Sequence, residues 1–71
     1  MKSNEFLKIF KRDGWVVMRI NGSHHIMAHP TKKIVGSPDN TISVPVHGSK
    51  EIGKGLGYKL LKAAGIKNVK L

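Results

Sequence analysis

The stretch WVVMRINGSHHIMAH, residues 15–29, decides the fold of this 71-residue chain. Residues 15–20 are rich in aromatic and β-branched types, which are typical of a strand. Asn21-Gly22 follows and is a strong hairpin signal, because both central residues of a type I′ turn need positive φ. A second strand runs from His24 to His29, and Pro30 ends it. The stretch therefore predicts two antiparallel strands joined by a tight turn.

The turn also predicts a register for the hairpin. With Asn21-Gly22 as a two-residue turn, Arg19 lies opposite His24, and directly opposed residues share a face of the sheet. One face then carries Trp15, Val17, Arg19, His24 and Ile26, and the other carries Val16, Met18, Ile20, His25 and Met27. Both faces are partly apolar, so the pattern does not indicate which one the helices cover. A three-residue turn would shift this register.

A helix is predicted before the hairpin, from Ser3 to Asp13. Its apolar residues follow the i, i+3, i+4 spacing of an amphipathic helix, and they are Phe6, Leu7, Ile9 and Phe10. Ser3 fits an N-cap, and Gly14 fits a C-terminal stop.

A loop, a third strand and a second helix are predicted after the hairpin. The loop covers residues 31–40, and the strand covers residues 41–46 with Pro45 indicating an edge or an end. A connector over residues 47–53 leads to a helix over residues 55–64. The buried stripe of this helix is predicted to be Leu56, Leu60, Leu61 and Ala64. Gly65 followed by Ile66 fits a Schellman stop.

These elements predict an α+β fold with the order α-β-β-β-α in one domain over residues 1–71. The three strands form an antiparallel sheet, and the two helices pack on one of its faces.

The charge of the chain is its strongest global signal. Thirteen Lys and Arg against four Asp and Glu give a formal charge of +9. Such a field attracts polyanions, of which nucleic acid is the commonest inside cells. Two alternatives are charge that serves only solubility, and a basic surface that an acidic protein covers. The absence of cysteine excludes disulfides, thiolate metal sites and cysteine nucleophiles.

No run of residues is apolar enough to predict a membrane span or a signal peptide. We therefore expect a cytoplasmic protein that makes no contact with a membrane.

The three clustered histidines do not form a pattern that favours a metal site. On a strand, His25 and His29 are separated by roughly 13 Å, at about 3.3 Å per residue, which is too far to share one ion. The neighbours His24 and His25 point to opposite faces. Cysteine is absent, and the few acidic residues lie elsewhere in the sequence. We therefore expect no metal ion and no other cofactor.

His24 is the histidine whose predicted surroundings suggest chemistry. A guanidinium beside it, from Arg19, disfavours a second positive charge and helps keep the imidazole neutral, so that it can act as a base. The same guanidinium can hold a phosphate. Proton abstraction from a ribose 2′-hydroxyl needs this combination. The spacing alone favours a strand histidine, hydrogen-bonded or facing solvent, that has no catalytic role.

Other basic and polar residues are candidates for phosphate binding. Lys32 and Lys33 lie in the loop, and His47 and Lys50 lie near the start of the second helix, where backbone N–H groups can bind a phosphate. The complete set of candidate RNA-binding or phosphate-binding residues is Arg19, Ser23, Lys32, Lys33, His47, Lys50 and Lys54.

The chain resembles the HicA (YcfA-like) toxins of HicAB toxin–antitoxin systems. Gly22-Ser23-His24-His25 carries the resemblance, together with the preceding Asp13-Gly14-Trp15 and the following His29-Pro30. The second half agrees through Val44-Pro45-Val46-His47, Lys50-Glu51-Ile52, Gly55 and the closing run from Leu60 to Ile66. The motifs occur in the right order from about Ser3 to Ile66. The loop over residues 31–40 is somewhat long for the family, and Gly57-Tyr58 and residues 67–71 depart from its usual pattern.

The resemblance implies a fold like that of the double-stranded-RNA-binding domain. It also implies mRNA interferase activity, which is metal-independent endonucleolytic cleavage of RNA that inhibits translation. His24 stands at the position of the catalytic histidine of the family. The implied partners are mRNA as substrate and a HicB-like antitoxin that covers the active surface, and we expect the free chain to be a monomer.

Two other functions are compatible with the same sequence. One is a non-catalytic module that binds double-stranded RNA by its shape and needs no strand histidine. The other is an interaction protein whose basic face docks an acidic partner. The second proton-transfer group of a ribonuclease also stays open, with His25, His47 and a lysine as candidates.

Overall fold

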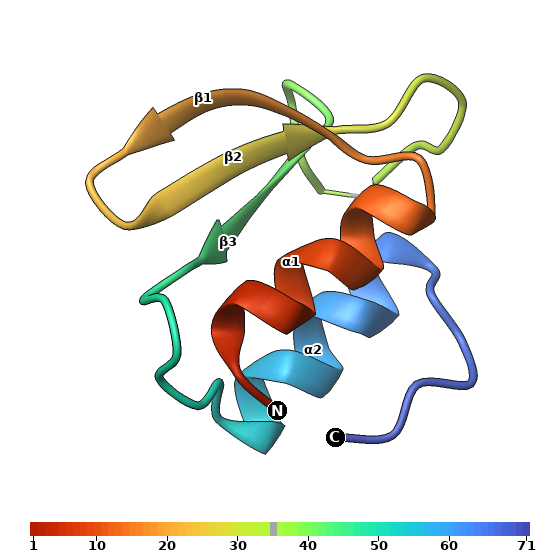
Figure 1. Ribbon diagram of the computed structural model, residues 1–71. Helices are drawn as coiled ribbons and strands as arrows, with labels where there is room; N and C mark the ends of the chain where they lie inside the picture. Colours follow the sequence, from red (N-terminus) through yellow and green to blue (C-terminus); the bar gives the residue numbers. More distant parts are fainter. Residues whose placement is uncertain (35) are drawn as a thin grey trace.

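The computed structural model of the chain describes residues 1–34 and 36–71. Helix α1 (Ser3–Arg12) is followed by strands β1 (Val16–Asn21), β2 (His24–Ala28) and β3 (Thr41–Pro45), and by helix α2 (Lys54–Ala64) (Figure 1). The predicted order α-β-β-β-α is therefore confirmed, with element bounds that differ by one or two residues from those expected.

The three strands form one antiparallel sheet in the order β1-β2-β3. Figure 1 shows both helices on the same side of this sheet, as predicted. The position of β3 at an edge explains how the strand tolerates Pro45, which has no N–H to donate to a neighbouring strand. The core between the sheet and the helices is formed by Phe6, Leu7, Phe10, Trp15, Met27, Ile42, Val44, Ile52, Leu61 and Ala64.

A chain of aromatic rings crosses this core. The ring centroids of Phe6 and Phe10 are 5.3 Å apart, those of Phe10 and Trp15 are 5.7 Å apart, and those of Trp15 and His29 are 5.2 Å apart. These separations are typical of favourable tilted and edge-to-face pairs. The chain of rings joins one helix to the beginning of β1 and the end of β2.

The hairpin turn differs from the predicted one. Asn21 pairs with His24, so the two-residue turn is Gly22-Ser23 and not Asn21-Gly22. Gly22 has a φ of 61°, whereas the non-glycine residues with positive φ in the described ranges are Asn40 and Asn68, so Ser23 has negative φ. Positive φ at the first central position alone, occupied by glycine, is the pattern of a type II′ turn. Gly22 can occupy the second central position of a type I′ turn or the first central position of a type II′ turn. The sequence therefore does not distinguish the two turns, and the predicted turn is displaced by one residue.

A β-bulge changes the predicted faces as well. Val17 pairs with Met27 and Arg19 pairs with Ile26, so Met18 is an extra residue between the two pairs. Because one residue is inserted, Val17 and Arg19 lie on opposite faces although they are two apart. The helices cover the face that carries Val17, His25 and Met27 of the hairpin. The predicted grouping of Val17 with Arg19, His24 and Ile26 is therefore wrong.

Both helices end just before the glycines that the sequence predicted. Gly14 and Gly65 both have positive φ beyond the last helical turns, as predicted. The amide of Gly65 donates to the carbonyl of Lys62 and that of Ile66 to the carbonyl of Leu61, which is a Schellman motif. No helix in the described ranges is long and apolar enough to span a membrane.

Ser3 is not the N-cap of α1, which is Lys2. Instead, Ser3 is buried, and its hydroxyl links the first turn of α1 to the connector before α2. It accepts a hydrogen bond from the amide of His47 at 2.8 Å and donates to the carbonyl of Gly48 at 3.1 Å. The amide of Ser3 also donates to the carbonyl of Lys50 at 2.8 Å.

Helix α2 buries a different stripe from the predicted one. Leu61 and Ala64 are buried and Leu60 is half-buried, as expected, but Leu56 is 45% exposed. Gly57 is buried in its place, and a Cβ at this position would lie 3.6 Å from Cε1 of Phe6 and would overlap the end of the Leu71 side chain. The distance to Phe6 is an ordinary contact, so a larger residue at this position would require the end of the Leu71 side chain to move.

Asp13 and Lys32 join the ends of four elements. The Asp13 carboxylate accepts hydrogen bonds from Trp15 Nε1 at 3.1 Å and from Lys32 Nζ at 2.5 Å. Lys32 Nζ also donates to the carbonyl oxygens of Ala64 at 3.0 Å and Gly65 at 3.3 Å, at the end of α2. The hydrogen bond from Lys32 holds the pKa of Asp13 below its ordinary value of 3.8, although partial burial acts in the opposite direction.

Replacing Ser3 with Ala should destabilise the protein by about 1–3 kcal/mol, because the amide of His47 and the carbonyl of Gly48 lose their buried partner. Urea denaturation followed by circular dichroism measures the difference. The control is Ser49→Ala in the same connector, which changes an exposed side chain and should alter stability by less than about 0.5 kcal/mol. Equal stability of Ser3→Ala and the parent would contradict the proposed link.

The Asp13 ion pair should make stability depend on pH. Because its pKa is lowered in the folded state, the ionised carboxylate contributes stability above pH 3.8, and this contribution is lost as the pH falls through the folded-state pKa. The parent should therefore be more stable than Asp13→Asn at neutral pH, and the difference should shrink as the solution is acidified below pH 3.8. Urea denaturation of both proteins across this range measures it. A difference that does not change with pH would sink the prediction.

Candidate functional site

The face of the sheet that the helices leave uncovered carries most of the candidate chemistry. Its residues follow from the register as three rows across the strands. We call this surface the open sheet face, and it consists of Asn21, His24 and Pro45, then Arg19, Ile26 and Ser43, then Val16, Ala28 and Thr41. None of these side chains is acidic, and the polar or charged ones are Asn21, His24, Arg19, Ser43 and Thr41, interspersed with apolar residues.

His24 is exposed at the hairpin end of the open sheet face. Its Nδ1 lies 3.1 Å from the hydroxyl oxygen of Ser43 on the neighbouring strand β3. A serine hydroxyl can donate to this nitrogen or accept from it, so both neutral tautomers of the ring keep the contact. The contact orients the imidazole with Nε2 toward solvent, and Nε2 has no hydrogen-bond partner in the described part of the protein.

Sequence reasoning missed Ser43. It lies between the buried residues Ile42 and Val44, so the alternation along β3 marks it as outward-facing. The missing information is the pairing of β3 with β2, because a long loop separates these strands and no turn fixes their register.

Arg19 is not the direct neighbour of His24 that the predicted register required. It lies opposite Ile26 on β2, and His24 is the diagonal neighbour two residues away. Diagonal positions on one face are about 7–8 Å apart, which is within reach of a long side chain such as arginine. Both side chains are exposed on the open sheet face, so Arg19 keeps a position from which it can contact a phosphate near His24.

The structure places His47 at the same end of the sheet as His24, which the sequence alone did not indicate. Pro45 pairs with His24, and the next amide, that of Val46, donates to the carbonyl of Ser23 at 2.8 Å. His47 follows directly and its side chain is exposed. A cleft of about 170 Å³ borders Pro45 and His47 and extends to Gly53 and Leu56 at the start of α2.

Ser23, Lys50 and Lys54 complete the candidates at this end of the molecule. Ser23 is the second residue of the hairpin turn. Lys50 belongs to the connector, and Lys54 is the first residue of α2. Both lysine side chains are exposed.

His25 and His29 have surroundings that differ from those of His24. His25 pairs with Ile20 and Val44 on the helix-covered face, and its Nδ1 is buried with no partner in the described residues. His29 Nε2 donates to the carbonyl of Asp13 at 2.7 Å, and its Nδ1 accepts from the amides of Thr31 and Lys32. His29 is thus a structural residue that fixes the end of β2.

None of the four acidic residues belongs to the open sheet face, although Asp39 accepts a hydrogen bond from Thr41 at the end of this face remote from His24. The terminal amine of Met1 pairs with Glu51 and lowers the pKa of that carboxylate. Hydrogen bonds from Thr41 and Ser37 lower the pKa of Asp39 in the loop. Within residues 1–34 and 36–71, no group of three or more histidine, cysteine or acidic side chains is arranged to hold a metal ion.

Lys32 and Lys33 are adjacent in the sequence but have different surroundings. The ammonium group of Lys32 donates to Asp13 and to the two carbonyls at the end of α2, which occupies its three hydrogens within the protein. Lys33 is exposed beside α2. The structure therefore gives Lys32 a structural position and leaves Lys33 accessible to a ligand.

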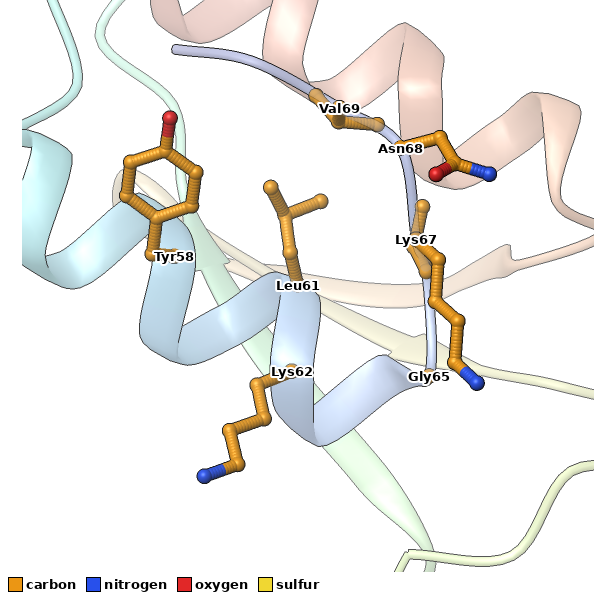
Figure 2. Close-up of a pocket in the computed structure, with 8 residues that line it drawn as sticks. Tyr58, Leu61, Lys62, Gly65, Lys67, Asn68 and Val69 are labelled. Atoms are coloured by element: carbon orange, nitrogen blue, oxygen red, sulfur yellow. The ribbon is translucent and has the colours of Figure 1, made fainter.

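A larger cleft, of about 320 Å³, lies between α2 and the C-terminal segment. Figure 2 shows Tyr58, Leu61 and Lys62 on α2 and the segment with Lys67, Asn68 and Val69 beside the helix, with the Lys62 ammonium group pointing away from that segment. The Tyr58 hydroxyl accepts a hydrogen bond from the amide of Leu71 at 2.9 Å. The cleft contains no histidine and no residue of the open sheet face, so it offers no acid–base chemistry comparable to that of His24.

The comparisons with known proteins agree with the resemblance found in the sequence. A family model described as "HicA toxin of bacterial toxin-antitoxin" matches residues 3–66, which is nearly the whole chain. A comparison with curated proteins gave no match.

Proposed function

The chain belongs to the HicA toxin family of bacterial toxin–antitoxin systems, and we propose that it is an endoribonuclease that cleaves RNA by proton transfer through His24. The observation that carries this proposal is the exposed imidazole of His24, which Ser43 orients on an open sheet face without acidic residues. The cationic groups of this face attract a polyanion, and Asp39, which is hydrogen-bonded to Thr41, lies at the end of the face remote from His24.

The proposed reaction uses a nucleophile from the substrate. With the ring proton on Nδ1 and Ser43 Oγ as its acceptor, Nε2 of His24 takes the proton of a ribose 2′-hydroxyl. The 2′-oxygen then forms a bond to the adjacent phosphorus, and the bond from phosphorus to the 5′-oxygen of the next nucleotide breaks. A general acid supplies a proton to the leaving 5′-oxygen. Because the nucleophile is the 2′-hydroxyl and not an activated water, this route does not require a metal ion.

His47 is the candidate for the general acid that the structure supports best. It lies at the same end of the sheet as His24, whereas His25 lies on the opposite face with its Nδ1 buried. Arg19 on the open sheet face is proposed to hold the phosphate that reacts, since a guanidinium can donate two parallel hydrogen bonds to it. Ser23, Lys33, Lys50 and Lys54 are proposed to hold neighbouring phosphates, and Lys32 is not, because Asp13 and α2 occupy its ammonium group.

The HicA family implies a HicB-type antitoxin as the partner of the chain. We propose that this antitoxin inhibits the enzyme by covering the open sheet face, and that the substrate is mRNA in the cytoplasm. Cleavage of mRNA there would inhibit translation. A purified HicB-type protein that binds the chain and leaves RNA cleavage unchanged would contradict this mode of inhibition.

Replacing His24 with Ala should lower the rate of RNA cleavage by about two to four orders of magnitude, because it removes the proposed general base. Single-turnover cleavage of a long RNA, with and without EDTA, measures the effect. EDTA should not change the parent rate, and an RNA with deoxyribose at the cleaved position should remain intact.

Three outcomes would contradict the proposed function or mechanism. Full activity of His24→Ala would exclude His24 as the catalyst, and loss of parent activity in EDTA would indicate a metal-dependent reaction. Tight binding of duplex RNA without any cleavage, unaffected by His24→Ala, would favour the non-catalytic double-stranded-RNA-binding module.

The pH dependence of cleavage should separate the roles of Ser43 and His47. A general base and a general acid together give a bell-shaped profile of kcat/KM against pH. His47→Gln should remove the limb of the profile that reports the acid. Ser43→Ala should lower kcat and keep both limbs, because it loosens the orientation of His24 without removing a proton-transfer group. If His47→Gln keeps the bell shape of the parent, His47 is not the acid.

A further inference from the structure

A groove runs along the helix side of the molecule, beside α2, and is not part of the site described above. Two adjoining hollows of about 300 and 370 Å³ share Lys33, Ile34, Lys62 and Ala63 and form one surface feature. We call it the lysine groove, and it lies between loop residues 32–34 and α2 residues 59–65. Ile34 and Ala63 form its apolar floor, and Lys33, Lys59 and Lys62 stand along its rim.

The three rim lysines make a concentrated positive charge. All three side chains are exposed, and neither of the two ion pairs in the described part of the protein includes one of them. Lys59 and Lys62 are three residues apart on α2, so they lie on the same side of the helix. No acidic residue lines either hollow. The groove therefore favours an anion with several negative charges.

Lys32 offsets the partial negative charge at the end of α2, which would otherwise repel such an anion. The C-terminal end of a helix carries a partial negative charge on its free carbonyl groups. At the end of α2 these are the carbonyls of Ala64 and Gly65, and Lys32 Nζ donates to both of them. Its ammonium group also compensates the charge of Asp13. The end of α2 that borders the groove is therefore partly compensated by the Lys32 ammonium group.

The surface of the groove suits phosphates and not bases. Trp15 is the single aromatic residue lining the two hollows, and it is 2% exposed, so no ring is available to stack on a base. Lysine ammonium groups act as point charges toward phosphates without reading sequence. A phosphodiester backbone is the ligand that this combination of features fits.

The lysine groove and His24 lie near opposite ends of β2. His24 begins β2, and the loop that carries Lys33 follows the other end of this strand. The length of β2 alone accounts for roughly 13 Å of this separation, and the two positions also lie on opposite sides of the sheet. At about 3.4 Å per stacked nucleotide, an RNA needs more than about four further nucleotides to reach from one position to the other.

We propose that the lysine groove is a second, non-catalytic site that binds the sugar–phosphate backbone of RNA outside the segment that His24 cleaves. This inference rests on the proposed ribonuclease function and adds a requirement for substrate length. Long RNAs contact both surfaces, whereas RNAs of about four nucleotides contact only one of them.

The test replaces Lys33, Lys59 and Lys62 together with Gln in a His24→Ala background, so that the RNA is not cleaved. The matched control replaces Lys8, Lys11 and Arg12 of α1 with Gln, which removes the same charge from another exposed surface. Fluorescence anisotropy measures binding of a labelled single-stranded RNA of about 20 nucleotides, and of one of about four, over a series of salt concentrations. Thermal unfolding checks that each variant is folded.

The groove variant should lower the slope of log K against log salt by about 2 for the long RNA, since three contacts to single strands contribute about 0.7 each. The affinity lost relative to the parent should therefore grow by about a hundredfold for each tenfold decrease in salt. The α1 variant should keep a slope close to that of the parent, and the short RNA, which cannot bridge both surfaces, should lose less affinity than the long RNA.

Equal slopes for the groove variant and the parent would overturn the proposal, and would leave an acidic protein as the ligand to consider for the groove. Equal losses in the groove and α1 variants would also overturn it, because they would indicate a bulk charge effect. The readout is binding, so a negative result would overturn the groove proposal without contradicting the assignment of His24, which the cleavage experiment tests separately.

Discussion

The contact between Asp13, Gly14 and His29 fixes the position of the hairpin relative to both helices. Nε2 of His29 donates to the Asp13 carbonyl, and a Cβ on Gly14 would lie 2.9 Å from the same nitrogen. Gly14 also has a φ of 100°, so other residues would be strained and would collide with the ring. The Asp13 side chain extends this junction through Lys32 to the end of α2. The ends of α1, β2 and α2 and the start of β1 therefore meet at one set of hydrogen bonds.

The junction explains why three neighbouring histidines have different surroundings. It holds His29 at one end of β2, and side-chain alternation then directs His25 toward the helices and His24 away from them. The register with β3 places Ser43 against the His24 ring. Part of the resemblance to the family, namely Asp13-Gly14-Trp15 and His29-Pro30, lies in this structural junction, and another part, around Gly22-Ser23-His24, lies in the candidate site.

Local signals predicted the elements well, because each depends on a few adjacent residues. Gly65 with Ile66 predicted the Schellman stop of α2, and the alternation of Ile42 and Val44 predicted β3. Several predictions that depend on pairing between elements were wrong. Gly22 serves a type I′ or a type II′ turn, nothing in the sequence marks Met18 as a bulge, and Ser3 bonds to a connector 44 and 45 residues away. The Arg19–His24 pair was lost for the same reason, since it required both the correct turn and an unbroken ladder.

The sequence by itself determined the element order, the basic charge and the family, because composition, periodicity and motif order are properties of the chain. The tertiary structure alone decided which face of the sheet stays open, that Ser43 contacts His24, and that Lys32 is a structural residue beside an accessible Lys33. These outcomes depend on strand register and on contacts between residues distant in the sequence. A shift of one residue in register moves every side chain of a strand to the other face, and only the packed core selects among the registers that the sequence permits.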